Sequence, residues 1–344
     1  MFGYQKSVLH SLRVVVLGLA AALCPVVSSA APAPETLLAQ GRVDDAISSL
    51  ETKLNNAPDD AQSYNLLCRA YFVVDNWEAA GKACEKAVFL QPSSSDFHLW
   101  LGRVYGEKAD HTNFISAAGM AKKVRNEFET AVRLNPANLE ARADLAQFYV
   151  EAPGIIGGGK DKAEGQAREI ANLDPAQGEL VEAWIAEKNK NLGSAEGHFR
   201  SAVQLSHGKP GAWLNLAQFY RRTGRMDKMQ DAVEHAISAN DSHRVLMQAA
   251  DILNRTKRNI PRAVELLRQY LSSPTAEDAP AFKAHYLLGT IYEQQGNTTA
   301  AAEEYRSALA LAKGYTLAQS ALDRVTRETA SGPTQANWHP SASE

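Results

Sequence analysis

The stretch that decides the fold is AQSYNLLCRAYFVVDNWEAAGKACEKAVFLQPSS, residues 61–94. In its first half, apolar side chains stand at positions i, i+3, i+4 and i+7, namely Tyr64, Leu67, Cys68 and Tyr71. That spacing places them on one face of an α-helix. The second half ends at Pro92, and proline cannot continue a helix. The segment therefore predicts two short amphipathic helices joined by a turn.

The same unit recurs along the chain. The sequence LAQFY at Leu145–Tyr149 returns at Leu216–Tyr220. Two pairs of residues lie 34 positions apart, Pro58 with Pro92 and Tyr71 with Tyr105. A single helix hairpin cannot bury its apolar face alone, so we expect the units to stack and to be stabilised by their neighbours.

With this period and these residues, the chain resembles the tetratricopeptide-repeat (TPR) family, whose unit is a pair of antiparallel helices. Residues 61–94 carry the family pattern at Tyr64, Leu67, Cys68, Tyr71, Ala80, Cys84, Ala87 and Pro92, with Cys84 where an aromatic residue is usual. Further copies start near 210 and 282, and weaker ones near 176 and 244. The resemblance implies an all-α fold, a right-handed α-solenoid of antiparallel TPR helix hairpins with a C-terminal capping helix.

The register of the repeats gives the expected boundaries. We expect a partial first unit at 31–60 and an array over 61–315, with units near 61–94, 95–138, 139–175, 176–209, 210–243, 244–281 and 282–315. Residues 316–329 predict a capping helix, and the Gly-, Pro- and Ser-containing residues 330–344 predict a disordered tail. Two units exceed the standard length, and we expect their extra residues between the helices, near 108–118 and 152–160.

The first thirty residues have the three-part pattern of a secretory signal peptide. Lys6 and Arg13 form a basic start, an uncharged apolar run follows over 14–23, and small residues precede Ala30. The run is shorter than the roughly 20 residues that a membrane-spanning helix needs. We expect cleavage after Ala30 and a periplasmic or secreted protein with no membrane span after cleavage. A retained membrane anchor is the alternative.

Composition and charge restrict the possible partners. Of 344 residues, 45% are hydrophobic, which is enough to fill a large core. Removing residues 1–30 takes away Lys6 and Arg13 and no acid, so the net charge falls from −3 to −5. A mildly acidic chain with scattered basic residues argues against a nucleic-acid partner. No histidine pair has the i, i+4 spacing of a helical metal site, and no nucleophile motif is present, so we expect no metal, cofactor or catalytic residue.

A glycine-rich segment is the most distinctive local feature of the chain. It comprises Pro153, Gly154, Gly157, Gly158, Gly159 and Lys160. Its pattern is one residue short of a phosphate-binding P-loop, which needs Ser or Thr after the lysine and a strand before the loop. Here Asp161 follows the lysine and a helix precedes the loop. A similar Pro-Gly-x-x-Gly-Gly insertion is associated with bacterial exported TPR proteins, so we expect a structural or docking role. Nucleotide binding is the alternative.

The cysteines that remain after residue 30 are Cys68 and Cys84. They fall in the two helices of one unit, on faces that should meet. A disulfide would close a short loop and contribute about 3 kcal/mol to stability by the chain-entropy model. Two buried free thiols are the alternative.

The resemblance also implies which residues face the concave groove of the solenoid. They are Asn65, Arg69, Arg103, Gln147, Trp184, Gln218, Arg221, Arg255 and Tyr286. Several are long polar side chains, and arginine offers forked donors for a peptide carboxylate. The Lys-Asn-Asn-Lys-Arg clamp of chaperone-binding TPR proteins is not reproduced.

These features together predict a protein that is not an enzyme. We expect a scaffold or adaptor of the cell envelope that holds a protein or peptide segment in a preformed groove. The alternatives are a nucleotide-binding or enzymatic protein that uses residues 153–161, and a structural protein associated with the cell wall.

Overall fold

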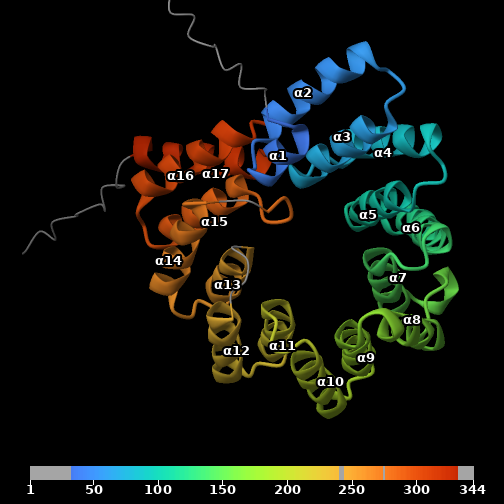
Figure 1. Cartoon of the computed structure of the whole chain (residues 1–344). Helices are drawn as coiled ribbons and strands as arrows, with labels where there is room; N and C mark the ends of the chain where they lie inside the picture. The colour runs from blue at the N-terminus through green and yellow to red at the C-terminus, as the bar shows by residue number, and fades with distance from the viewer. Residues whose placement is uncertain (1–31, 240–243, 274–275, 332–344) are drawn as a thin grey trace, which may run out of the picture. The chain divides into compact units, whose positions relative to one another are not determined.

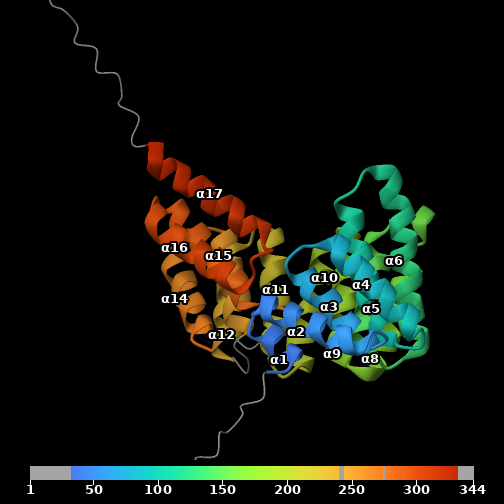
Figure 2. The ribbon, with the colours of Figure 1, turned by 90° about the horizontal axis from the view of Figure 1, so that it is seen from above.

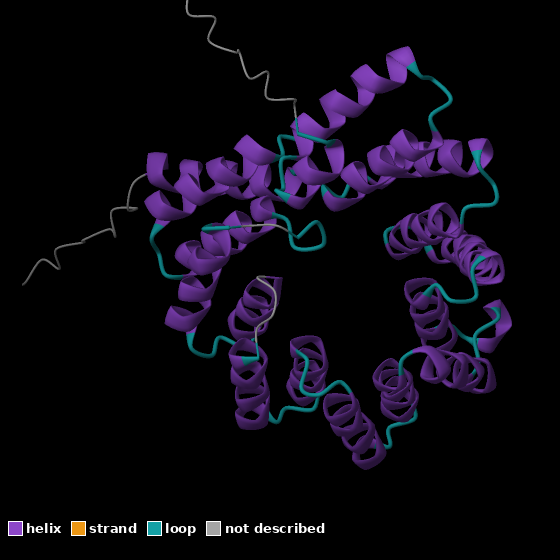
Figure 3. Ribbon diagram, viewed as in Figure 1, coloured by secondary structure: helices purple, strands orange, loops and turns teal. Residues whose placement is uncertain are grey.

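The computed structural model describes residues 32–239, 244–273 and 276–331. The chain divides into two compact units, Met1–Pro32 and Ala33–Glu344, and the account below concerns the second. The expected signal peptide, and all but the first two residues of the expected tail, lie outside the described residues. Within them the chain is helical and contains no strand (Figure 3).

Seventeen α-helices follow one another in the described residues. They are α1 (Pro34–Ala39), α2 (Val43–Asn56), α3 (Ala61–Val73), α4 (Trp77–Leu90), α5 (Ser95–Asp110), α6 (Phe114–Leu134), α7 (Leu139–Glu151), α8 (Lys160–Leu173), α9 (Pro175–Lys188), α10 (Leu192–Leu205), α11 (Pro210–Arg222), α12 (Met226–Ser238), α13 (Arg244–Arg255), α14 (Ile260–Leu271), α15 (Ala281–Gln294), α16 (Thr298–Leu311) and α17 (Thr316–Ser331). A 3-10 turn, η1 (Gly154–Ile156), lies between α7 and α8. Consecutive helices pack as hairpins, so the predicted all-α solenoid is confirmed.

Helix starts are specified locally by capping side chains. Asn76, Asn113, Asn138, Asn191 and Asn297 each accept a hydrogen bond from the backbone N–H three residues later. Such a cap satisfies one of the donors that a helix start leaves unpaired. The repeat therefore carries its own start signal at these helices, four of which, α4, α6, α10 and α16, are the second helix of a hairpin.

Small residues let the two helices of a hairpin approach closely. An ideal Cβ at Gly102 of α5 would lie 2.5 Å from the ring of Phe128 on α6. At Gly289 of α15 it would lie 2.4 Å from the ring of Tyr305 on α16. Both rings are buried, so neither has open solvent to move into. The small residue of the first helix is thus the close-approach position of these two hairpins.

Replacing Gly102 by valine should lower the free energy of unfolding by about 2 kcal/mol, because the new side chain would overlap Phe128 in a filled core. Gly106 is a matched control on the same helix, since its Cβ would meet no atom within 4 Å. Gly106→Val should not lower the free energy of unfolding, because its side chain overlaps no neighbour and valine is a better helix former than glycine. Urea unfolding of both variants measures the difference, and equal losses would contradict this packing.

On α5, α7 and α11, a tyrosine reaches back to the preceding hairpin. The hydroxyls of Tyr105, Tyr149 and Tyr220 donate to Glu85, Glu129 and Glu196 over 2.8–2.9 Å. Burial raises the pKa of Tyr105 and of Tyr149, so both stay protonated donors at neutral pH. These bonds join successive hairpins at their apolar interfaces and help to fix the stacking.

The long unit that starts near residue 95 differs from expectation. Its extra residues were predicted to lie between the helices, near 108–118. The structure instead extends α5 to Asp110 and starts α6 at Phe114, with Asn113 as its cap. Residues 111–113 alone remain as the connection, because no proline or helix-ending glycine interrupts the lengthened helices.

In the second unit, helices α5, α7, α11 and α13 lie on the inner side of the curve, and α6, α8, α12 and α14 lie outside (Figure 1). The first and last hairpins of this unit also meet. Leu37, Leu38 and Val43 share one buried cluster with Phe282 and Tyr315. The backbone N–H of Lys313 donates to Asp44 over 3.0 Å. Figure 2 shows α1 beneath the C-terminal helices in a second view.

Candidate binding surface on the inner face

Three cavities lie along the inner side of the array. The first cavity, about 1040 Å³, is lined by α3, α5, α6 and α7 and by residues 277–283, which include the described end of the α14–α15 connection. The second cavity, about 390 Å³, lies between α7, α9 and α11. The third cavity, about 770 Å³, is lined by α11, α13 and α15. Together these three cavities are lined by residues of α3, α5, α7, α9, α11, α13 and α15.

The first cavity contains two arginines arranged around one indole. The guanidinium carbon of Arg69 lies 5.2 Å from the ring centre of Trp100, and that of Arg103 lies 4.8 Å from it. Phe72 packs edge-on against the same indole, with ring centres 5.5 Å apart. Guanidinium groups are attracted to the negative face of an indole. The cluster of Arg69, Trp100 and Arg103 is therefore held by packing before any ligand arrives.

Each of these arginines already has acidic partners. Arg103 on α5 donates to Asp144 over 2.6 Å and to Glu140 over 2.9 Å, both on α7. Burial raises the pKa of Asp144, an effect that Arg103 only partly offsets. Arg69 donates through Nε to Glu277 over 2.8 Å, and its second nitrogen contacts the other oxygen of that carboxylate. The guanidinium donors of Arg69 and Arg103, which the sequence suggested for a peptide carboxylate, are thus already bonded to carboxylates of the chain itself.

The structure places most of the predicted groove residues in these cavities. Arg69, Arg103 and Gln147 line the first, Gln147 and Trp184 line the second, and Gln218, Arg255 and Tyr286 line the third. Gln147 is exposed and belongs to two cavities. Arg221 donates to Gln218 over 3.0 Å, and Arg255 pairs with Asp251 over 2.6 Å.

Asn65 does not lie on an accessible surface. Its side chain is in the interior, 2% exposed, and its amide nitrogen has no hydrogen-bond partner among the described residues. The family position predicted a groove residue here. The Asn65 side chain instead faces the interior of the packed helices, where a peptide cannot reach it.

Several residues of this surface were not predicted from the sequence. Trp100, Asp144, Glu277, Asp278 and Lys283 all line the first cavity. Trp100 had a local signal, as an aromatic residue three positions before Arg103 on the same helix face. Glu277 and Lys283 had none, because they come from the other end of the array.

The backbone amides of the glycine-rich segment are hydrogen-bonded to nearby carbonyls of the chain. The N–H groups of Gly157, Gly158 and Gly159 donate to the carbonyls of Gly154, Pro153 and Tyr149 over 2.9–3.2 Å. A phosphate-binding loop needs such amides free to point at the ligand. Lys160 pairs with Glu164, four residues on, over 3.2 Å. The geometry favours a structural turn, in which a Cβ at Gly158 would lie 1.8 Å from the carbonyl oxygen of Ala152.

Millimolar ATP with magnesium should therefore leave the melting temperature of the protein unchanged. The expected result is the same for Lys160→Ala, because the lysine serves an exposed ion pair and the amides are already bonded. Differential scanning fluorimetry measures both. A rise in the wild-type protein that is lost in Lys160→Ala would contradict the structural assignment and favour nucleotide binding.

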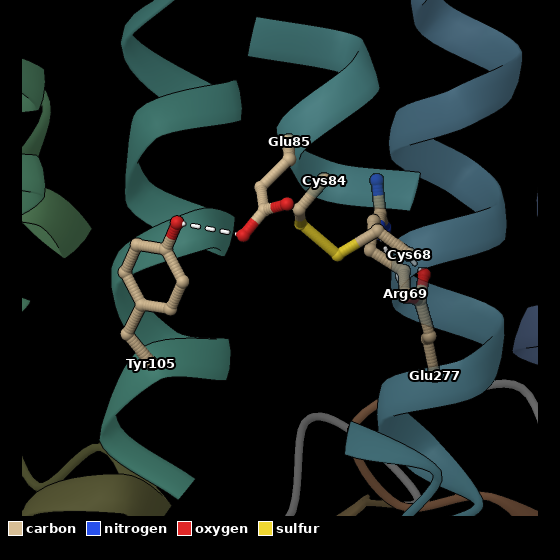
Figure 4. Close-up of a disulfide and its surroundings, with 6 residues drawn as sticks. All are labelled: Cys68, Arg69, Cys84, Glu85, Tyr105 and Glu277. Carbon is tan, nitrogen blue, oxygen red and sulfur yellow. Dashed lines mark hydrogen bonds and ion pairs between the residues drawn. A yellow bond between two sulfur atoms is a disulfide. The ribbon is translucent and has the colours of Figure 1, made fainter. Parts of the chain in front are cut away.

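Cys68 and Cys84 are bonded to each other, with their Cα atoms 5.1 Å apart. The sequence had left this pairing open. The disulfide joins α3 to α4, and both sulfur-bearing residues are fully buried. Figure 4 shows that the next residue in each helix makes an outward contact, Arg69 with Glu277 and Glu85 with Tyr105. The disulfide therefore braces the backbone that presents Arg69 to the first cavity.

Neither a metal site nor a membrane span is found among the described residues. They contain no group of three or more His, Cys, Asp or Glu side chains placed to hold a metal ion. No helix among them is long and apolar enough to cross a membrane.

Comparison with known proteins supports the repeat architecture. Residues 35–95 and 253–316 match one tetratricopeptide-repeat family model, and residues 210–243 match a second. No curated protein matches the chain.

Among solved structures, the chain is similar to yeast Tom70, with a TM-score of 0.50 and 17% identity, covering 85% of this chain and 60% of Tom70. It is also similar to a thermophilic TPR protein of Thermus thermophilus, with a TM-score of 0.46 and 18% identity, covering 54% of this chain and 94% of that one. The family matches and the likeness to Tom70 support the fold alone, an all-α solenoid of TPR hairpins.

Proposed function

We propose that this chain is an exported, non-enzymatic adaptor of the cell envelope that binds a segment of another protein along its inner face. TPR proteins in general mediate protein–protein interactions, and stacked repeats create extended concave surfaces for that purpose. We assign this general role to the present chain on the basis of the cavities along its inner face.

The observation that carries the proposal is the continuity of the three cavities. The first and second share Gln147 and Glu151, and the first and third share Arg244, Asp278 and Lys283. A binding path therefore follows the inner helices from α3 to α15. It combines indole and phenol rings with amides and charged groups, which suits an extended peptide segment. Because rigid helices hold these groups, binding would require little ordering of the protein.

Two features support export. The sequence of residues 1–30 has the composition of a secretory signal peptide. The disulfide between Cys68 and Cys84 is of a kind that persists in oxidising compartments and is rare in the cytosol. N-terminal sequencing of the protein from its native cells tests this part, and the expected mature start is Ala31. A start at Met1 in a cytosolic fraction would contradict it.

Site-specific photo-crosslinking in native cells tests the binding surface. A photoreactive residue at Gln147 or Gln218 lies in the cavities, whereas one at Gln269 lies on the exposed face of the outer helix α14. We expect both inner positions to label the same protein and Gln269 not to label it. Equal labelling from all three positions, or none from the inner two, would contradict the proposal.

A further inference from the structure

The connection between α14 and α15 places a carboxylate inside the first cavity. The part of it next to α15, Ala276–Pro280, contains Glu277 and Asp278. Arg69 on α3 grips the Glu277 carboxylate with two nitrogens, and the two residues lie 208 positions apart in the sequence. Asp278 accepts from Arg244 at the start of α13 over 2.7 Å. The array thus binds an acidic dipeptide of its own chain on its inner face.

The contact between Arg69 and Glu277 has the form of a ligand contact. Arginine and carboxylate meet through two parallel hydrogen bonds, which is the geometry that selects a carboxylate over other acceptors. The guanidinium also lies over the Trp100 indole, which holds its plane in place. The pair is mostly shielded from water, with side chains 25% and 18% exposed for Arg69 and Glu277.

The partners of Arg103 provide a contrast. Asp144 and Glu140 lie on α7, the inner helix of the next hairpin, about one repeat further along the sequence. That pairing joins neighbouring hairpins, as do many ion pairs of this protein. Glu277 lies on the α14–α15 connection, 208 positions from Arg69 in the sequence, and both line the first cavity, so this pair does not join consecutive hairpins. Lys283 and Asp75 pair over 3.4 Å between the same parts of the chain.

The backbone of the connection is held without these carboxylates. The hydroxyl of Tyr270 donates to the carbonyl of Ala279, and both residues are buried. Ala281 packs against Gly41, where an ideal Cβ would lie 2.7 Å from the Ala281 nitrogen. The Glu277 side chain can therefore leave Arg69 by rotating about its own bonds while the connection stays in place.

We propose that Arg69 and Trp100 form a carboxylate subsite of the inner face, and that Glu277 is a built-in competitor that an acidic side chain of the partner displaces. This inference rests on the proposed function and names the chemistry of the partner, a segment carrying Asp or Glu. Self-occupation lowers the apparent affinity for the partner by the fraction of molecules in which the subsite is filled. It also discriminates against segments without a carboxylate, because they cannot replace the bonds that Arg69 would lose.

The test uses the chain's own sequence as the probe. The peptide Ala-Glu-Asp-Ala-Pro, acetylated and amidated, is titrated into wild-type protein and into Glu277→Gln. The readout is the indole N–H signal of Trp100 in NMR spectra, assigned with Trp100→Phe. We expect Glu277→Gln to bind the probe about tenfold more tightly than the wild type does. The neutral peptide Ala-Gln-Asn-Ala-Pro should bind neither protein.

Two variants control the result. Glu265→Gln removes a carboxylate that pairs with Arg262 over 2.8 Å on the outer helix α14, outside the three cavities, so it should leave probe affinity nearly unchanged. Arg69→Gln added to Glu277→Gln should abolish the gain. Equal gains in Glu265→Gln and Glu277→Gln, a gain that survives loss of Arg69, or no binding to either protein would overturn the inference. So would loss of the helical circular dichroism signal in Glu277→Gln, because the pair would then be a structural clasp.

The assay contains no cellular partner, so its outcome is separate from that of the crosslinking. If the peptide did not bind but Gln147 still labelled a protein partner, the proposed function would stand. Only the inference that the partner carries Asp or Glu would be lost. Failure of the crosslinking would remove the proposed function and would leave the measured competition at Arg69 as a property of the chain.

Discussion

Replacing Phe199 by alanine should lower the free energy of unfolding by about 4 kcal/mol, since losses of 3–5 kcal/mol are usual when a buried phenylalanine is truncated. The Phe199 side chain on α10 is 0% exposed and packs on Phe219 of α11, with ring centres 5.1 Å apart. Truncation would leave a cavity between two hairpins, and stability in a repeat array depends on such nearest-neighbour interfaces. Equilibrium urea unfolding measures the loss.

Phe89 offers a matched control for this substitution. It lies on α4 and is 76% exposed, so Phe89→Ala removes the same atoms from water rather than from a core. We expect a change within about 0.5 kcal/mol. Hydrogen exchange should show faster opening of α10 and α11 in Phe199→Ala, with little change in α3 and α4. Equal losses in the two variants would show that the interface between α10 and α11 is not packed as described.

Reducing the disulfide between Cys68 and Cys84 should lower the free energy of unfolding by about 3 kcal/mol, because the unfolded chain regains the freedom of the loop between two cysteines 16 positions apart. The loss should appear as an earlier urea transition in the presence of a phosphine reductant. Cys68→Ala and Cys84→Ala together should unfold at a similar midpoint with or without the reductant. Because either replacement breaks the bond, each single variant should already show most of the loss.

Titration of thiols in the denatured, unreduced protein provides a second measure of the same bond. Neither Cys68 nor Cys84 should react before reduction, and both should react after it. Two reactive thiols before reduction would mean that the protein carries buried free cysteines, and the brace beside Arg69 would then be absent.

The local part of the fold was accessible from the sequence for a physical reason. Tyr71 and Tyr105 recur at the period of the hairpin, and Asn76 and Asn138 cap helices by contacts within four residues. Such signals depend on neighbours in the chain, so they can be identified without coordinates. The all-α solenoid, and most of the residues on its inner side, could therefore be predicted.

The remaining features depend on geometry that accumulates along the array. Asn65 is buried although its position in the repeat predicts exposure, because small rotations of the helix decide which side chains face a neighbour. Whether Glu277 meets Arg69 depends on the summed rotation of the hairpins between them, and no local pattern encodes that sum. The lengthened α5 and α6 also lie between these two residues in the chain. The burial of Asn65 and the contact between Arg69 and Glu277 could therefore be found only from the structure.

The measurement that tests the central claim most directly is the affinity of the crosslinked partner for two variants with the same substitution. Gln147→Arg places a bulky side chain where the first and second cavities meet, and Gln269→Arg places it on the outer helix α14. Isothermal titration calorimetry should show binding weakened about tenfold or more for Gln147→Arg, and unchanged for Gln269→Arg. Unchanged binding to Gln147→Arg, or equal weakening by both variants, would contradict the assignment of the inner face as the binding surface.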